Sequence, residues 1–351
     1  MQWSAEGRVF RTFARHFLPN RLDALCKRAA RKGHAKILLG WNRGLGDIAL
    51  GLYAIVHRIR FWIPDAQIVF LVRENLLDGF SLLAGVEAIA APRWKRGEPY
   101  DVEKTLLEQG RSPKEFDLIL AWPNPTDWVR WQHGNLVPRL FWKKEHDELW
   151  KKFDLQDDCI YIGAQVSAET NYGLWRNWPE ERWREFFQKL KMYKKARVLL
   201  FGFGREPAFE SDQIIDLRGK TALFELLSIV KNRCRHLIAP DSGILSMAYY
   251  LYTAFPLQVV SLWADPNHGI LKQNVASPNP LLTHRPLIGS HRDCSTIGVD
   301  LVLSTLFGKN HAFLNFKSSG NIFSNTSNRG FIAARSERTY GVPCTTQALE
   351  N

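Results

Sequence analysis

The sequence lacks the features that mark disulfide-rich, zinc-binding and exported proteins. No two of its five cysteines form a C-x-x-C pair: Cys26, Cys159, Cys234, Cys294 and Cys344. Their wide separation and odd number argue against a disulfide framework and against a structural zinc site. Arginines interrupt every apolar run near the N-terminus, so no secretory signal peptide is indicated. We therefore expect a protein of the reducing cytoplasm.

Two further absences concern membranes and metals. The longest uncharged stretch, 244–264, is broken by Pro256 and Gln258, and its second half has the pattern of a strand. We expect a buried helix followed by a core strand there, and no membrane span. No D-x-D motif is present to hold a divalent metal, so we expect no metal site.

The overall composition is that of a folded, basic protein. A length of 351 residues fits two domains of about 100–200 residues each. Hydrophobic residues make up 45% and charged residues 23%, which excludes a mostly disordered, collagenous or coiled-coil chain. A net charge of +12 favours an anionic partner. Because no basic reading motif accompanies this charge, nucleic acid is not the expected partner.

Apolar runs alternate with helical periodicity from residue 36, and the alternation restarts near residue 156. The expected strands are Lys36–Trp41, Gln67–Val72, 116–122, 159–164, Ala196–Phe201, 213–217, 236–239 and Leu257–Trp263. The expected helices are 47–62, 179–192, 221–231 and one that begins at Ser242. Such alternation predicts an α/β protein with parallel sheets covered by helices. We expect Rossmann-like domains at 36–155 and 156–312, with a charged helical connector at 143–158.

The two ends differ from these domains. Residues 1–35 form a basic amphipathic arm, which predicts a helix packed on the domain, contact with an anionic membrane surface, or both. Its basic residues are Arg8, Arg11, Arg15, Arg21, Lys27, Arg28, Arg31 and Lys32. Residues 313–351 are rich in Ser, Asn, Thr and Gly without an apolar period, so we expect a loose tail.

Ligands of doubly wound sheets bind beyond the carboxyl ends of the strands, so the loops there are the candidate sites. In the loop 42–47, Gly44 and Gly46 allow a ligand to approach the backbone. Asp47 lies where the next helix begins and is either a functional acid or a helix cap. Arg43 and Arg73 follow the first two strands and are further candidates for binding substrate.

Two loops of the second half suit an anionic ligand. Arg176 precedes a helix that starts near Pro179, where its guanidinium could bind a diphosphate or remain a simple surface group. The backbone N–H groups at the start of the following motif could bind an anion, unless Asp241 is only a helix cap. That motif consists of Asp241, Ser242, Gly243 and Ile244.

A basic and aromatic stretch at 122–133 follows an expected strand of the first domain. Trp128 could stack on an acceptor glycan, and Arg130 could pair with its anionic groups. Ordinary aromatic packing under a long loop is the alternative.

The order and spacing of several motifs resemble the heptosyltransferase family, the family-nine glycosyltransferases. The motifs span about 36–310 and are Leu45-Gly46-Asp47, Pro64-Asp65-Ala66, Arg176 with Trp178-Pro179, Gly202-x-Gly204-x-Glu206, Asp216-Leu217-x-Gly219-Lys220-Thr221 and Asp241-Ser242-Gly243. The sequence departs from the family at Ser246, where the family usually has histidine, at Pro240, and at 163–170, a loose match to its glycine-rich loop.

The resemblance implies a GT-B fold, in which two Rossmann-like doubly wound domains face a central cleft. It implies inverting, metal-free transfer of heptose from ADP-heptose to the lipopolysaccharide core, an anionic glycolipid, at the cytoplasmic face of the inner membrane. The donor would be a substrate, and no cofactor is implied. Asp47 would be the base beside Gly46, and Arg176 and the helix start at 242–244 would bind the diphosphate. Asp216 would hold the ribose, or it is a structural acid at the end of its strand.

Two alternatives remain open. The same scaffold could use another nucleotide sugar, or the chain could be a non-catalytic descendant that binds a glycan or a membrane surface. The loss of histidine at Ser246 favours the descendant, whereas the presence of Asp47 and Arg176 disfavours it.

Overall fold

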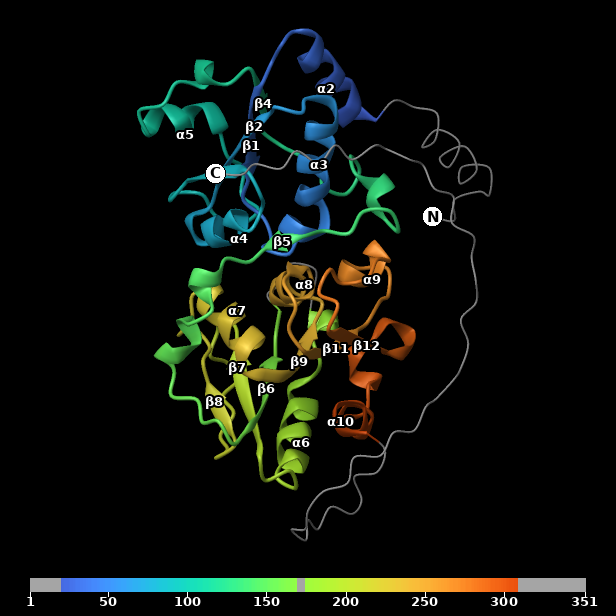
Figure 1. The fold of residues 1–351 in the computed structure, drawn as a ribbon. Coiled ribbons are helices and arrows are strands. Elements are labelled where there is room, and N and C mark those ends of the chain that lie inside the picture. Colours follow the sequence, from blue (N-terminus) through green and yellow to red (C-terminus); the bar gives the residue numbers. More distant parts are fainter. Residues whose placement is uncertain (1–19, 169–173, 309–351) are drawn as a thin grey trace, which may run out of the picture. The chain divides into compact units, whose positions relative to one another are not determined.

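Two parallel sheets organise the protein in a computed structural model that describes residues 20–168 and 174–308 (Figure 1). The first sheet has the order β3-β2-β1-β4 and is formed by β1 (Lys36–Trp41), β2 (Gln67–Val72), β3 (Val86–Ala90) and β4 (Leu118–Leu120). The second has the order β12-β11-β9-β6-β7-β8 and is formed by β6 (Ile160–Gln165), β7 (Ala196–Phe201), β8 (Ile214–Asp216), β9 (Cys234–Pro240), β11 (Leu257–Trp263) and β12 (Leu282–Ile288). All neighbouring strands in both sheets are parallel, which confirms the α/β prediction.

Helices cover both faces of the first sheet because its central strands β1 and β2 are continuous apolar runs whose consecutive side chains point to opposite faces. Leu38 of β1 packs with the side chains of α5 (Val102–Glu108). Its neighbours Ile37 and Leu39 belong to the core on the opposite face. That face is covered by α2 (Arg21–Arg31) and α3 (Tyr53–Trp62), while α4 (Leu77–Ser81) packs near β3.

The second sheet is also covered on both faces. The α6 helix (Glu180–Leu190) and the α10 helix (Val299–Phe307) contribute aromatic and aliphatic side chains to one core. The opposite core contains side chains of α7 (Leu223–Asn232) and α8 (Gly243–Tyr249), and α9 (Gly269–Gln273) packs against α8. This second core is continuous with the α2 and α3 side of the first sheet. Accordingly, the described residues 20–168 and 174–308 belong to one compact unit, and the predicted domain boundaries at 35/36 and 155/156 stay predictions.

The strand order reverses at one place in each sheet. In the first sheet this switch point lies between β1 and β4, and in the second between β6 and β9. Chains leaving the carboxyl ends of such strands run in opposite directions and open a crevice where ligands bind. The loops after β1, β4, β6 and β9 are therefore the places to examine.

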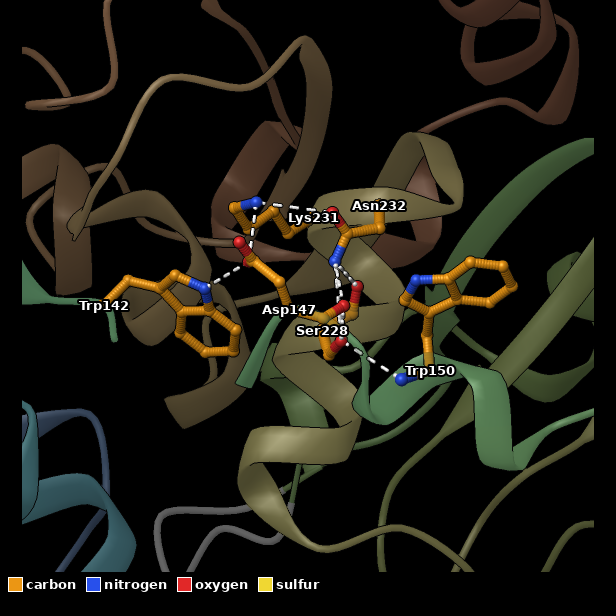
Figure 2. Close-up of polar contacts among 6 residues, drawn as sticks. All are labelled: Trp142, Asp147, Trp150, Ser228, Lys231 and Asn232. Atoms are coloured by element: carbon orange, nitrogen blue, oxygen red, sulfur yellow. Dashed lines mark hydrogen bonds and ion pairs between the residues drawn. The ribbon is translucent and has the colours of Figure 1, made fainter. Parts of the chain in front are cut away.

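The connector at 143–158 differs from the expected helix. It contains two short 3-10 helices, η5 (Lys144–His146) and η6 (Leu149–Lys152), and its polar groups bond to α7 (Figure 2). The carbonyl oxygen of Asp147 accepts hydrogen bonds from Ser228 and Asn232, each at 3.0 Å. Its carboxylate lies 2.8 Å from the Lys231 ammonium and accepts the Trp142 indole N–H at 2.7 Å. These contacts with α7 replace the internal hydrogen bonds that a continuous helix would need. A two-residue parallel ladder also joins β5 (Leu140–Phe141), just before the connector, to β10 (Leu251–Tyr252).

The predicted basic arm is helical in its described part. The buried side chains of α2 are Leu22, Cys26 and Ala29, and the carboxylate of Asp23 pairs with Arg58 of α3 at 2.5 Å. The packed-helix prediction is thus confirmed for α2. Arg8, Arg11 and Arg15, and the tail at 313–351, lie outside the described residues.

The uncharged stretch 244–264 forms most of α8, then β10 and β11, and most of its side chains are buried. None of the described helices is both long enough and apolar enough to cross a membrane. The expected strand at 116–122 is shorter, because β4 ends at Leu120.

Candidate active site at the strand ends

Asp47 lies immediately before η1 (Ile48–Leu52), a short π-helix that follows β1, but its side chain does not cap that helix. The carboxylate instead accepts the backbone N–H of Gly44, with 3.1 Å between Oδ2 and N. A Cβ atom on Gly44 would lie 2.9 Å from Oδ2, so a glycine permits this close approach. The carboxylate is thus held in the loop, half-buried, rather than used as a helix cap.

The surroundings of Asp47 shift its protonation equilibrium. Burial has the largest influence and raises the pKa of the Asp47 carboxyl above its usual value. The Gly44 N–H and the guanidinium groups of Arg43, Arg96 and Arg176 act in the opposite direction by favouring the charged form. A carboxylate with a raised pKa is a better proton acceptor than an ordinary surface aspartate. Because Arg176 follows β6, the site combines loops of both sheets.

Sequence reasoning missed Arg96, which lies in the loop after β3. Buried Asn42 ties this loop to the one after β1. The Asn42 side-chain NH₂ group donates to the backbone carbonyl oxygens of Lys95 at 2.8 Å and Glu98 at 2.7 Å, and the backbone carbonyl of Asn42 accepts the N–H of Gly97 at 3.3 Å. The sequence does contain a signal that could have identified Arg96 as a candidate. Residues 93–96 are basic and aromatic, like the stretch 122–133 that was considered as a glycan site.

Arg43 and Arg73, both candidates for binding substrate, occupy different positions. The Arg73 guanidinium donates to the backbone carbonyl of Arg43 at 2.9 Å, so it braces the loop that carries Asp47. The Arg43 side chain is exposed, and its charge lowers the pKa of the Asp47 carboxyl against the effect of burial. Arg43 is therefore the better placed of the two to meet a substrate.

Arg176 and Asp241 form an ion pair that joins the loops after β6 and β9. The two side chains are only 19% and 8% exposed. The thiol of Cys294 donates to the backbone carbonyl of Arg176 at 3.5 Å, which fixes the main chain there. Burial, and then the charge of Arg176, lower the pKa of nearby His268. The guanidinium thus lies among groups from several loops.

The start of α8 differs in detail from its expected form. Ser242 caps the helix, and Asp241 does not: the Ser242 hydroxyl oxygen accepts the Leu245 N–H at 3.2 Å. The same hydroxyl donates to Gln165, the last residue of β6, at 2.6 Å. It therefore bridges the two strands at the switch point of the second sheet, and Ile244 behind it is buried.

The loop 42–47 lies directly against the start of α8. A Cβ atom on Gly243 would approach the Leu45 Cβ to 3.0 Å and the Gly46 backbone nitrogen to 3.2 Å. A Cβ atom on Gly46 would approach the Ser246 hydroxyl oxygen to 3.2 Å. Small side chains at these positions therefore allow the loops of the two sheets to meet. Ser246, the departure from the expected histidine, lies at this contact.

Asp216 is engaged within the protein. Its two carboxylate oxygens accept hydrogen bonds from the Arg218 guanidinium at 2.9 Å and 2.7 Å. These bonds hold the pKa of the Asp216 carboxyl below its usual value, although burial opposes them. Arg218 is 1% exposed and also donates to the Pro207 carbonyl at 2.9 Å. The contacts fit the structural alternative for Asp216, and its ribose-binding role stays a prediction.

Trp128 and Arg130, the two residues predicted to bind an acceptor glycan, differ in their surroundings. Trp128 is 9% exposed, and its ring lies under the Arg21 guanidinium at 6.0 Å, so its burial does not fit the predicted stacking role. Arg130 pairs with Asp127. The exposed indole of this stretch belongs to Trp122, at 52%.

Within residues 20–168 and 174–308, no group of three or more His, Cys, Asp or Glu side chains is placed to hold a metal ion.

Searches of known proteins bear on the fold. The chain matches no protein-family model and no curated protein. It does match the structure of E. coli ADP-heptose LPS heptosyltransferase II at 17% identity and a TM-score of 0.56, over 78% of this chain and 97% of that one. It also matches a glycosyl transferase family 9 protein from Veillonella parvula at 16% identity and a TM-score of 0.54, over 78% and 98%. At this identity the likeness shows the fold: two parallel sheets arranged as in GT-B heptosyltransferases, as the motifs predicted.

Proposed function

We propose that the protein is an inverting glycosyltransferase in which Asp47 accepts the proton of the acceptor hydroxyl. One observation carries this proposal: a carboxylate with a raised pKa lies at the switch point of the first sheet, with Arg176 from the second sheet close to it. The acceptor oxygen forms a bond to the anomeric carbon while the bond from that carbon to the diphosphate oxygen breaks. The diphosphate leaves with the electron pair, and the acceptor proton passes to Asp47.

The departing diphosphate needs positive charge, which we assign to Arg176. A guanidinium can donate two parallel hydrogen bonds to phosphate oxygens, and the ion pair with Asp241 holds this group in position. A bound donor would share or replace that contact. The similar E. coli structure is named for ADP-heptose and LPS, which supports ADP-heptose as the donor and a lipopolysaccharide core as the acceptor. Another nucleotide sugar on the same scaffold is the alternative.

Calorimetric titration with ADP, UDP and GDP, each with magnesium and with EDTA, tests this proposal. We expect one nucleotide to bind clearly more tightly than the others and EDTA to leave its affinity and the transfer rate unchanged. Loss of transfer on chelation, restored by Mg²⁺ or Mn²⁺, would contradict the metal-free mechanism. Failure of all three nucleotides to bind would favour a non-catalytic protein that binds a glycan or a membrane.

We further propose that the protein acts at the cytoplasmic face of the inner membrane, where an anionic glycolipid acceptor would be presented. The support is α2, whose apolar side is buried while its basic residues are exposed: Arg21, Lys27, Arg28, Arg31 and the adjacent Lys32. Attachment through this face would be electrostatic, at roughly 1 kcal/mol for each basic residue near the lipid.

Charge reversal tests the membrane proposal. Replacing Arg28, Arg31 and Lys32 with glutamate should reduce co-sedimentation with vesicles containing phosphatidylglycerol, and salt should reduce the binding of the unaltered protein, because both weaken attraction to the anionic surface. A matched triple reversal at the exposed residues Lys191, Lys194 and Lys195 should have less effect. Equal losses in the two variants would show that only net charge matters.

A further inference from the structure

We propose that Trp122, supported by Tyr100, is a stacking surface that holds a sugar ring of the acceptor beside Asp47. This inference rests on the proposed function for the reaction and adds the residues that position the acceptor. The sequence analysis gave no role to Tyr100. Within the stretch 122–133 it expected Trp128, rather than Trp122, to stack on the glycan.

The position of Trp122 follows from strand pairing in the first sheet. Leu120 at the end of β4 pairs with Leu39 of β1, so Trp122 leaves the sheet level with Trp41. The loop that carries Asp47 begins at the next residue, Asn42. Trp122 and this loop therefore flank the β1/β4 switch point, where a ligand of this sheet is expected.

Three aromatic rings lie in contact in a row at this place, each tilted against the next. The ring centroids of Trp94 and Tyr100 lie 3.9 Å apart, and those of Tyr100 and Trp122 lie 3.8 Å apart, with interplanar angles of 31° and 32°. Gly40 of β1 makes room for the row, because a Cβ atom there would lie 2.8 Å from the Tyr100 ring. Hydrogen bonds anchor the inner rings: the Tyr100 hydroxyl donates to the Ala121 carbonyl at 2.6 Å and the Trp94 indole to the Thr105 hydroxyl at 3.0 Å.

The inner rings are therefore fixed, while the indole at the end of the row is 52% exposed. A purely structural tryptophan in this row would be expected to bury most of its surface in the core beneath it. A rigid flat ring binds with little loss of conformational freedom. A sugar ring offers a suitable partner, because the C–H groups on one of its faces can pack on an indole while its hydroxyls stay at the rim.

Polar groups that could receive those hydroxyls lie near the same row. The Arg43 charge acts on both the Tyr100 hydroxyl and the Asp47 carboxyl, lowering each pKa against the raising effect of burial. The amide of Asn42 ties the loop that precedes Tyr100 to the loop of Asp47. A sugar on Trp122 would thus lie beside Arg43 and direct a hydroxyl toward the base.

The test uses oligosaccharides released from lipopolysaccharide by deacylation, added to the full chain. Two-dimensional ¹H–¹⁵N spectra report the indole Nε1 of each tryptophan, and the Trp122 signal is identified by its loss in Trp122→Phe. We expect the sugar to shift this signal. Trp122→Ala should raise the oligosaccharide Kd and the acceptor KM roughly tenfold, Trp122→Phe should restore most of the affinity, and the nucleotide Kd should stay unchanged.

Phe61→Ala provides the matched control, because Phe61 is an aromatic side chain 60% exposed on α3. It should leave the oligosaccharide affinity unaltered, and thermal melting establishes that each variant is folded. An unshifted Trp122 signal, or unchanged affinity in Trp122→Ala, overturns the inference. A loss of nucleotide affinity in Trp122→Ala also overturns it, by placing a nucleobase on the ring. Oligosaccharide binding through Trp122 without any transfer would instead contradict the proposed reaction and leave the subsite standing.

Discussion

Replacing Asp47 with asparagine should lower kcat at least about a hundredfold while leaving the fold and the donor affinity nearly unchanged, as expected when a general base is removed. The asparagine oxygen can still accept the Gly44 N–H, so the loop keeps its hydrogen bond. Initial rates at saturating donor and acceptor measure the loss, and calorimetry measures donor affinity. Asp154→Asn, at an exposed position of the same half and outside the motifs, is the control.

The pH dependence provides a second test of Asp47. Its carboxyl must be deprotonated to act, so kcat should fall as the pH drops through the raised pKa of that group. Arg43→Ala removes a positive charge that favours the carboxylate, so the acid limb of the profile should move to higher pH. Full turnover in Asp47→Asn, or an acid limb that persists in it, would leave Asp47 only a loop-forming role.

Replacing Arg176 with alanine should weaken nucleoside-diphosphate binding roughly ten- to a hundredfold while leaving the free nucleoside almost unaffected, because the lost contact is a charge-assisted hydrogen bond to phosphate. Arg176→Lys keeps the charge but loses the planar fork, so an intermediate loss is expected. Calorimetry with a nucleoside and its diphosphate measures the difference. Arg184→Ala, on the exposed side of α6, is the control.

The buried partner of Arg176 needs separate attention in this experiment. Asp241 is 8% exposed, and removing Arg176 alone would leave its charge without this partner, which can destabilise the fold. The double variant Arg176→Ala with Asp241→Asn removes both charges and should show the same selective loss of diphosphate affinity. Equal weakening of nucleoside and diphosphate in the double variant would place Arg176 outside the phosphate site.

The sequence was sufficient for the central strands because these strands are continuous apolar runs covered on both faces. The edge strands β3 and β12 were not predicted because their sequences mix polar and apolar residues, as Glu87 and His284 illustrate. The prediction of a helix at 143–158 was wrong for a different reason. Its charged composition suits a helix, but the main-chain and side-chain groups of Asp147 bond to α7, which lies some 80 residues further along the chain.

The roles of individual side chains were harder to predict from the sequence than the positions of the strands. That Asp47 and Arg176 follow the first strands of their sheets could be predicted from the pattern, and the resemblance to the GT-B fold implied that these two loops face one cleft. The engagement of Asp216 with Arg218 and the burial of Trp128 depend on packing that no local pattern records. Arg96 approaches Asp47 through the bonds of Asn42 to residues more than 50 positions away, so only the folded chain brings it into the site.

Asn42 also limits which substitutions the loops after β1 and β3 can tolerate during evolution. Its buried amide, 2% exposed, donates to two carbonyl oxygens of the loop that carries Arg96. An aspartate there would turn its acceptor oxygens toward two other acceptors, so a one-atom change would disturb both loops together. In a genetic screen for loss of function, an Asn42→Asp allele should therefore resemble substitutions at Asp47, even though the Asn42 side chain is buried and its bonds are to the protein itself. Substitutions that remove this amide should therefore alter the loops after β1 and β3 together, whereas substitutions that keep it can change one loop without the other.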